Sequence, residues 1–331
     1  MAENEPQGAS IEVNWPLDGT TVYATLLRPQ RGDHLPAAVM VAGSGPTDRD
    51  WNSPLLPGTN GSARLLAEGL AGRGFASLRY DKRVAGPHGP ENYAALAGKV
   101  SFQSHVDELA GAVRFLAGQD FVDPARIFAL TNSEGAFHAL NYQVHDPQTP
   151  FAGLVLIAPP GRVMSEVGRG QIAAQVAPLP NGSAILAAYD EQIARFEAGE
   201  PVALDPALPQ GVQMLLQGLS APGNQPFARE LWMADTTPWL AQVTVPVLVV
   251  IGKKDIQVDW QADGGRLQQA VAGHNNVEFV FPENANHVLK YEPVPRAELT
   301  AAEATPRYNE LDTVLDPKAE AVILEWLAAH S

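Results

Sequence analysis

The sequence contains no cysteine among its 331 residues. This absence excludes a thiol nucleophile, a disulfide framework and a metal site built from cysteine. Positive charge is also scarce, because 22 lysine and arginine residues oppose 37 aspartate and glutamate residues and leave a formal net charge of −15. Such a chain repels nucleic-acid phosphates and anionic membrane surfaces, so we expect no nucleic-acid partner.

Long apolar runs are missing too. No stretch approaches the roughly 20 apolar residues that cross a bilayer, so we expect no membrane span. Residues 1–6 lack the basic and apolar segments of a signal peptide. The same N-terminal residues would result if a signal peptide had been removed and Met1 then added. The sequence therefore leaves open whether the protein is in the cytoplasm, in the periplasm or outside the cell. The sequence equally leaves open whether the chain forms a homo-oligomer.

Ligands for a metal or cofactor are not apparent. No histidine and carboxylate recur at a helical spacing of four with a third ligand available, so neither a metal nor a cofactor is expected. Apolar residues make up 45% of the chain and charged residues 18%. This composition is typical of a globular protein with a packed core.

Short apolar runs alternate with helical patterns over most of the chain. Residues 11–16 and 21–27 predict a hairpin across Asp18 and Gly19. From residue 37 onward the apolar runs are continuous, as in buried parallel strands of βαβ units. The further expected strands are 37–42, 76–80, 126–130, 151–158, 246–252 and 277–281, and the expected helices are 63–70, 102–116, the segment after Ser133, 265–271 and 319–327. The pattern predicts an α/β fold with a mostly parallel central sheet.

The alternation stops between Pro159 and Val245. We expect a first core part at residues 1–158, an inserted helical unit at 159–245 and a second core part at 246–331. The insertion is either a packing subdomain or a cap over the carboxyl ends of the strands, where open α/β sheets bind ligands. Its expected helices are 172–176, 184–196, 212–219 and 227–240. Residues 292–306 predict a long surface loop.

Ser133 lies where an apolar strand pattern breaks into a turn of small residues and then resumes at helical spacing. This is the arrangement of a nucleophile elbow, a sharp turn that exposes a serine hydroxyl to a base. The chain passes closely at such a turn, which requires small neighbours. Gly135 meets that requirement and Thr131 meets it in part. The alternative interpretation is a strand that ends in a turn with Ser133 or Asn132 as a helix N-cap.

Two further residues follow predicted strands and complete the chemistry that a serine nucleophile needs. His287 lies in the loop after the last expected strand, and Asp255 follows the strand before it. The order Ser133, Asp255, His287 is that of a nucleophile, an acid and a base in α/β-hydrolases. Asp259 and Asp263 are distant alternatives for the acid. The other histidines lie in turns, at the terminus or on helices, His105 among them on an expected surface helix: His34, His88, His105, His138, His145, His274 and His330.

An oxyanion requires N–H donors at the place where negative charge develops. The backbone N–H of Glu134 would be one donor, at the start of the helix after Ser133. The second is expected from Ser44 or Gly45, in the glycine-rich loop after the strand at residues 37–42. Neither nucleotide-binding glycine motif occurs in this loop, so a phosphate site is not expected.

Five segments together resemble the α/β-hydrolase serine esterases, and more narrowly a bacterial esterase group with a Gly-Ser-Gly-Pro oxyanion loop and a Ser-Glu-Gly elbow. These segments are residues 42–50, 79–83, 132–135, 252–258 and 285–287. The resemblance covers the chain from about residue 37 onward. It implies the α/β-hydrolase fold, with Ser133 as nucleophile, Asp255 as acid and His287 as base.

The sequence departs from that group at three places. Thr131 replaces the usual elbow glycine, Asn132 replaces a histidine often found before the serine, and residues 84–90 form an altered and longer loop. Nearby charged residues are interpreted chiefly as ion pairs that fix the two loops: Asp48, Arg49, Asp81, Lys82 and Arg83.

The residues and the resemblance together predict a carboxylic ester hydrolase that acts on a small-molecule ester through an acyl-enzyme. A serine at the elbow argues against the haloalkane dehalogenases and epoxide hydrolases, which use aspartate. Peptidase, thioesterase and acyltransferase activities need the same three side chains and stay open, as does a ligand-binding homologue without turnover. Apolar residues of the insertion lead us to expect neutral, short- to medium-chain esters: Ile172, Val176, Leu179, Ile185, Leu186, Met214, Leu215, Leu216, Leu231, Trp232 and Met233.

Overall fold

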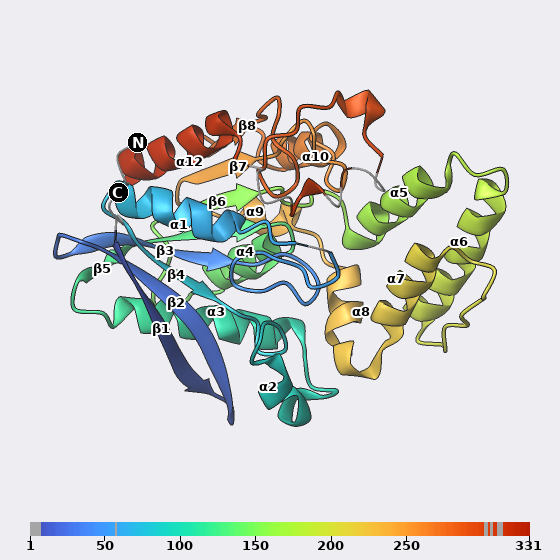
Figure 1. Cartoon of the computed structure of the whole chain (residues 1–331), viewed down its shortest axis with the longest axis horizontal. Coiled ribbons are helices and arrows are strands. Elements are labelled where there is room, and N and C mark those ends of the chain that lie inside the picture. The colour runs from blue at the N-terminus through green and yellow to red at the C-terminus, as the bar shows by residue number, and fades with distance from the viewer. Residues whose placement is uncertain (1–7, 57, 301–303, 305–306, 310–313) are drawn as a thin grey trace.

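The computed structural model describes residues 8–56, 58–300, 304, 307–309 and 314–331. An eight-stranded sheet forms its centre, with the strand order β1-β2-β4-β3-β5-β6-β7-β8 (Figure 1). The strands are β1 (Gly8–Leu17), β2 (Thr20–Pro29), β3 (Leu35–Val41), β4 (Ala76–Tyr80), β5 (Val122–Asn132), β6 (Gly153–Ile157), β7 (Val247–Val250) and β8 (Val277–Val280). Strands β1 and β2 pair antiparallel, β2 and β4 also pair antiparallel, and all other neighbours are parallel. The predicted α/β fold with a mostly parallel sheet is confirmed.

The predicted hairpin across Asp18 and Gly19 is confirmed as well. Both residues have a positive φ, at 48° and 76°. A two-residue turn with this backbone matches the twist of the strands that it joins, and Asp-Gly is a preferred sequence for it. The ten residues of β1 pair in register with β2, from Leu17 opposite Thr20 to Gly8 opposite Pro29.

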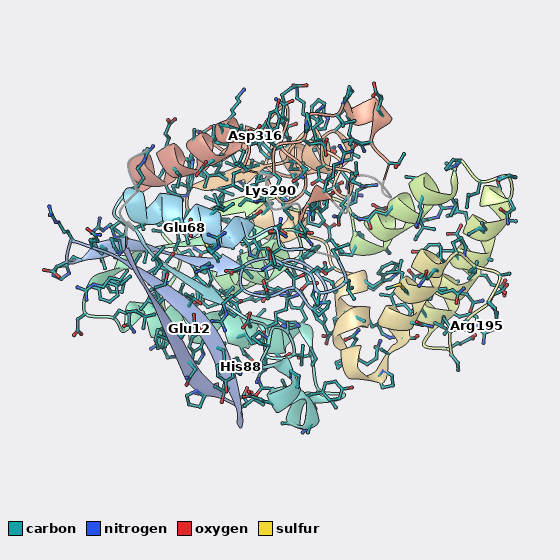
Figure 2. The ribbon with its side chains drawn as sticks, in the orientation of Figure 1. Glu12, Glu68, His88, Arg195, Lys290 and Asp316 are labelled. Carbon is teal, nitrogen blue, oxygen red and sulfur yellow. The ribbon has the colours of Figure 1, made fainter. Side chains whose placement is uncertain are left out.

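Helices cover both faces of the sheet. Helices α1 (Ser62–Gly72) and α12 (Pro317–His330) contact each other on one face, and α3 (Phe102–Ala117) and α4 (Gly135–Val144) contact each other on the opposite face (Figure 1). Helix α2 (Gly89–Leu96) lies in the connection from β4 to α3, and α10 (Ala262–Ala270) lies between β7 and β8. Side chains fill the space between the sheet and these helices (Figure 2). The central parallel strands are therefore buried on both sides, which explains their continuous apolar runs.

Five helices lie between β6 and β7. They are α5 (Met164–Val176), α6 (Gly182–Ala198), α7 (Gln210–Ser220), α8 (Phe227–Trp232) and α9 (Thr237–Leu240), with a short 3₁₀ turn, η1 (Pro222–Asn224), after α7. Helices α5 to α8 project away from the sheet, and Arg195 of α6 lies on the distant side of this projection (Figures 1 and 2). In contrast, α9 packs on α4 and α10. The inserted helices therefore divide between a projecting group, α5 to α8, and one helix that belongs to the main body.

The projecting group has an apolar core of its own, separate from the core around the sheet. Most of the apolar residues singled out in the insertion serve that core or pack against it, whereas Leu179, Met214 and Met233 are exposed. The core includes Ile172, Val176, Ile185, Tyr189, Ile193, Phe196, Leu208, Val212, Leu216, Leu219, Ala228 and Trp232. Two separate cores predict that the projecting group can loosen without disturbing the sheet.

Of two further predictions about local structure, one is wrong and one is confirmed. The single helix expected at residues 227–240 is two helices, because Asp235 accepts hydrogen bonds from the backbone N–H and the hydroxyl of Thr237 and so forms a turn between them. The surface loop expected at 292–306 is confirmed over its described residues, because most of residues 293–300 are exposed, although Glu292 is buried and accepts a hydrogen bond from Arg307. This loop contains the short 3₁₀ turn η2 (Arg296–Glu298), and residues 301–303 and 305–306 lie outside the described residues.

None of the described helices combines the length and the apolar character that a bilayer span requires.

Replacing Leu216 by alanine tests the separation of the two cores. Leu216 is fully buried in the projecting group, and the lost methyl groups and residual cavity should cost about 2–5 kcal/mol locally. We expect faster amide hydrogen exchange in α5 to α8 and unchanged protection in β5 and β6. Leu156→Ala, in the sheet core, is the matched control and should accelerate exchange in the sheet. Equal acceleration in both regions of L216A would contradict two separate cores.

Candidate active site

Ser133 forms a sharp turn between β5 and α4. Its φ of 51° lies in the left-handed region, which is unfavourable for a residue with a side chain. Its backbone N–H donates to the carbonyl of Ile157 in β6 at 2.8 Å, and its own carbonyl accepts from Ala136 at 3.0 Å. Neighbouring strands and the first turn of α4 therefore hold this strained backbone. Ser133 is 8% exposed.

The turn crosses the end of β3 so closely that Gly135 has no room for a side chain. A Cβ at this position would lie 2.7 Å from the carbonyl oxygen of Val41 and 3.0 Å from that of Ala42. Thr131, the departure on the other side of the serine, is fully buried, and its hydroxyl has no hydrogen-bond partner within the described residues. The elbow thus accommodates threonine at the cost of an unpaired polar atom.

The alternative interpretation of Ser133 or Asn132 as a helix N-cap is wrong. Helix α4 has Glu134 at its N-cap position, and no side chain caps it. The Asn132 side chain instead donates from Nδ2 to the backbone carbonyl of His287 at 3.0 Å. Asn132 therefore attaches the loop after β8 to the turn that contains Ser133.

Asp255 and His287 form a buried pair. Nδ1 of His287 lies 2.8 Å from Oδ2 of Asp255, and the two residues are 6% and 1% exposed. The other carboxylate oxygen of Asp255 accepts from the backbone N–H groups of Gln257 and Val258, at 2.7 and 3.0 Å. These bonds fix the carboxylate and direct the Nδ1 proton of the imidazole toward it, which leaves Nε2 unprotonated in the neutral ring.

Two observations bring the pair and the serine to one edge of the sheet. Asp255, His287 and Ser133 all follow carboxyl ends of parallel strands, and the bond from Asn132 joins the His287 loop to the elbow. Within the described residues, neither the Ser133 hydroxyl nor Nε2 of His287 makes a hydrogen bond. Such contacts often become short only when a substrate is bound.

The alternative acids have other partners. Asp263 is fully buried and accepts from the backbone and the guanidinium of Arg162, at 2.8 to 3.0 Å. Asp259 accepts from the N–H groups of Gln261 and Ala262 at the start of α10. Asp263 therefore pairs with Arg162, and Asp259 caps the first turn of α10.

The glycine-rich loop after β3 lies directly beside the elbow. A Cβ at Gly43 would be 3.3 Å from Cβ of Ser133 and 2.9 Å from Oδ1 of Asn132. Within the described residues, the N–H groups of Ser44, Gly45 and Glu134 donate to no backbone or side-chain acceptor. Gly43 therefore lies beside the serine, and the three predicted donors make no hydrogen bond within the described residues.

Lys82 joins this loop to the elbow. The sequence predicts an ion pair at Lys82 but does not identify its partner, Glu134. The Nζ of Lys82 donates to the carbonyls of Gly43 and Gly45, at 2.6 and 3.1 Å, and to Oε1 of Glu134 at 2.9 Å. Glu134 is 1% exposed. Burial alone would raise the pKa of its carboxyl, but Lys82 and the hydrogen bond from His138 outweigh burial and lower that pKa well below its ordinary range. The only signal in the sequence was Lys82 within the segment 79–83.

The neighbouring charged residues form the expected ion pairs, except for Asp48. Arg49 binds Asp81 at 2.7 Å, and Arg83 binds Glu108 of α3 at 2.9 Å. Asp48 makes no ion pair within the described residues, because its oxygens accept from the N–H groups of Asp50 and Asn52 and from the Asn52 side chain. These pairs lie mainly inside the protein, not on its surface.

His105 is expected on a surface helix, but its side chain is buried. It is 4% exposed, and its Nδ1 lies 2.9 Å from Oε2 of Glu108. Its ring lies 5.3 Å from that of His138 and packs against Phe227 of α8. Burial lowers the pKa of His138 although Glu134 opposes this effect.

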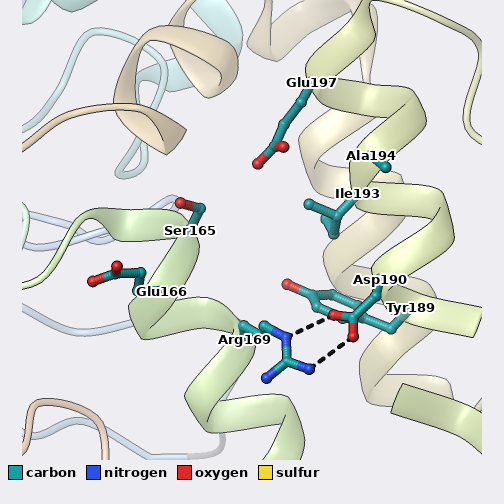
Figure 3. A pocket seen from close by; sticks show the side chains of 8 residues that line it. All are labelled: Ser165, Glu166, Arg169, Tyr189, Asp190, Ile193, Ala194 and Glu197. Carbon is teal, nitrogen blue, oxygen red and sulfur yellow. Dashed lines mark hydrogen bonds and ion pairs between the residues drawn. The ribbon is translucent and has the colours of Figure 1, made fainter. Parts of the chain in front are cut away.

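A separate hollow lies between α5 and α6 in the projecting group (Figure 3). Its volume is about 260 Å³, and Arg169 and Asp190 form two hydrogen bonds of 2.8 Å across one side of it. Ser133, Asp255 and His287 do not line it. Within the described residues, no group of three histidine, aspartate or glutamate side chains could hold a metal ion.

The fold and this edge of the sheet define the class: the chain has the α/β-hydrolase fold. The fold also occurs in esterase Pf2001 of Pyrococcus furiosus, which is similar to this chain with a TM-score of 0.56 and 14% identity over 99% of this chain and 95% of that one. Proline iminopeptidase of Mycobacterium smegmatis is similar with a TM-score of 0.52 and 18% identity, over 97% of this chain and 98% of that one. At such identities the likeness shows the fold alone.

Sequence comparison adds one curated relative. Esterase EstD of Thermotoga maritima is 26% identical over 261 residues, which are 79% of this chain and 56% of that protein. The chain thus matches little more than half the length of this relative. No family model matches the sequence.

Glu108→Gln tests the buried charges beside the site. Burial would raise the pKa of Glu108, but His105 and Arg83 outweigh it and lower that pKa from 4.5 to about 2. Because the folded-state value lies below the unfolded one, ionised Glu108 stabilises the fold above pH 4.5, and this contribution is lost as the pH falls toward 2. The variant leaves Arg83 without its partner, so we expect a loss of about 3–5 kcal/mol at pH 7.

Urea denaturation between pH 3 and pH 7 measures this effect. E108Q should show a shallower decline in stability toward low pH than the parent protein. Glu91→Gln, which removes an exposed pair with His88, is the control and should change stability little. An unchanged pH slope in E108Q would contradict the assignment.

Proposed function

We propose that the protein is a carboxylic ester hydrolase in which Ser133 is the nucleophile, His287 the general base and Asp255 the residue that orients His287. The observation that carries the proposal is the buried contact of 2.8 Å between His287 and Asp255, on a loop that Asn132 attaches to the strained turn at Ser133. The likeness to esterase EstD supports the same class of reaction.

The proposed reaction proceeds in two halves. The Ser133 Oγ attacks the carbonyl carbon of the ester while Nε2 of His287 takes the hydroxyl proton, and the carbonyl electron pair moves onto oxygen. The oxyanion accepts hydrogen bonds from the N–H of Glu134 and from one N–H of the Gly43–Gly45 loop. When the intermediate collapses, His287 returns its proton to the departing alcohol oxygen and an acyl-enzyme remains. Water then repeats these steps, and the acid and free Ser133 are released.

Asp255 contributes by holding the imidazole. Its bond to Nδ1 leaves Nε2 unprotonated, and its negative charge stabilises the imidazolium that forms during attack. The N–H groups of Gln257 and Val258 fix the carboxylate itself. Burial of the pair excludes water, which strengthens these electrostatic contacts.

For the substrate, we propose a neutral ester with a short- to medium-length apolar group. Helices α5 to α8 are proposed to act as a cap, and the exposed Met214 and Met233 give this group apolar surface outside its own core. Polarisable, unbranched methionine side chains suit contact with varied acyl chains. A peptidase, a thioesterase or an acyltransferase would use the same three residues, and acyl acceptors other than water would reveal the last of these.

Labelling with a fluorophosphonate, followed by mass spectrometry, tests the nucleophile. We expect a single adduct at Ser133 and hydrolysis of p-nitrophenyl esters with a preference for short and medium acyl chains. Ser133→Ala should abolish labelling and lower kcat at least about a thousandfold. Ser10→Ala, an exposed serine on β1, is the matched control and should retain both. Folded protein without an adduct at Ser133 would favour a ligand-binding homologue instead.

Asp255→Asn tests the role of the buried carboxylate. An amide at this position can donate to Nδ1 and so favours the tautomer with the proton on Nε2, which cannot accept the serine proton. We expect kcat to fall by about three to four orders of magnitude while KM changes little. Steady-state kinetics on a p-nitrophenyl ester measure both constants. A variant with parental kcat would exclude Asp255 from the mechanism.

A further inference from the structure

The ammonium group of Lys82 is placed to control the oxyanion site. It is the one described charge that bonds both to the loop after β3 and to the residue that follows Ser133. Lys82 is 6% exposed and Glu134 1% exposed. A buried ion pair gains strength from its surroundings but requires close geometry to offset the loss of water. Lys82 meets this requirement with three acceptors within 3.1 Å.

Because the peptide bond is planar, a carbonyl held by Lys82 also fixes the direction of the N–H group in the same peptide. In a trans peptide the carbonyl of one residue and the N–H of the next point to opposite sides. Because Lys82 holds the Gly43 carbonyl, the N–H of Ser44 points away from Lys82. The Gly45 carbonyl is held in the same way, but the next residue is Pro46, which has no N–H. Of the two peptides whose carbonyls bind Lys82, only the Gly43–Ser44 peptide has an N–H group to donate.

The Gly45 N–H belongs to the Ser44–Gly45 peptide, whose carbonyl accepts a weaker hydrogen bond. The carbonyl of Ser44 accepts from the hydroxyl of Thr47 at 2.7 Å, a bond between neutral groups. Charged donors form hydrogen bonds roughly twice as strong. Gly43 is also the loop residue whose Cβ position lies 3.3 Å from Cβ of Ser133. These differences favour Ser44 over Gly45 as the second donor.

We propose that Lys82 is the positioning residue of the oxyanion site, which it assembles by holding the Gly43 carbonyl and the Glu134 side chain together so that the N–H groups of Ser44 and Glu134 both face the developing negative charge. The proposal rests on the esterase function proposed above. It assigns Lys82 no proton transfer and no contact with substrate. The residue acts through the Gly43–Ser44 peptide and the Glu134 side chain.

Lys82→Met keeps the length and apolar stem of the side chain and removes its three hydrogen bonds. We expect kcat to fall about 10²- to 10³-fold, the usual effect of losing one oxyanion donor, and KM to stay within about threefold. The affinity for a trifluoromethyl ketone, which forms an oxyanion on the serine, should fall by the same factor as kcat. Unchanged kcat and ketone affinity in folded K82M would overturn the proposal.

Two further variants separate positioning from support of the fold. K82M leaves the buried Glu134 carboxylate without its cationic partner and with only the contact to His138, so the double variant Lys82→Met/Glu134→Gln should recover stability but not kcat. Recovery of kcat together with stability would overturn the proposal. Arg83→Met removes the adjacent buried pair with Glu108, which does not touch the loop. It should lower stability while ketone affinity and kcat stay within about threefold.

A crystal structure of K82M supplies a readout that does not depend on turnover. We expect the peptide between Gly43 and Ser44 in a different orientation, with the Ser44 N–H turned away from Ser133. An unchanged peptide would overturn the role of Lys82 even if the esterase function stands. Conversely, unmodified protein that neither reacts with fluorophosphonate nor hydrolyses esters would contradict the proposed function. A reoriented Gly43–Ser44 peptide in K82M would still support the positioning role of Lys82.

Discussion

The close crossing of the Ser133 turn over the end of β3 is the constraint on which the site depends. A non-glycine residue at a φ of 51° is disfavoured by about 1–2 kcal/mol, so surrounding contacts must impose it. The hydrogen bond to Ile157 and the contact of Gly135 with Val41 impose it here. The resulting turn lifts the serine side chain out of the sheet and directs the first N–H groups of α4 toward the same space. The backbone strain at Ser133 and the arrangement of the groups around it are thus two results of one packing arrangement.

Buried charge is the second element, and its placement explains why the site is rigid. The residues at 81, 82 and 83 point in different directions and bind Arg49, Glu134 and Glu108. One short segment after β4 therefore fixes the loop after β3, the elbow after β5 and helix α3. Each pair would be costly to leave half-made in the interior, so the loops have few alternative arrangements. Burying these ion pairs costs free energy, but the pairs fix the positions of nearby uncharged groups in the loops.

Much of this arrangement could be predicted from the sequence, and the reasons are physical. Periodicity predicted the parallel strands, because burial on both faces produces continuous apolar runs. Strand order along the chain then placed Ser133, Asp255 and His287 at one edge. The contacts of Lys82 could not be predicted, because spacing says nothing about which acceptor a long flexible side chain will reach. The burial of His105 was missed for a related reason: a polar residue on an amphipathic helix looks exposed until its partner, Glu108, is known.

Helices α5 to α8 contrast with this rigid edge. Their apolar core is separate from the sheet core, yet Phe227 of α8 packs on the buried rings of His105 and His138. His138 in turn contacts Glu134 at 3.3 Å. The projecting group therefore has its own core but stays attached to the main body through these ring contacts and through polar bonds, such as that of Glu166 with Arg266 and that of Glu230 with the Phe102 N–H. Under the proposed function, such a division would let the surface of the projecting group change without altering the groups that would perform the chemistry.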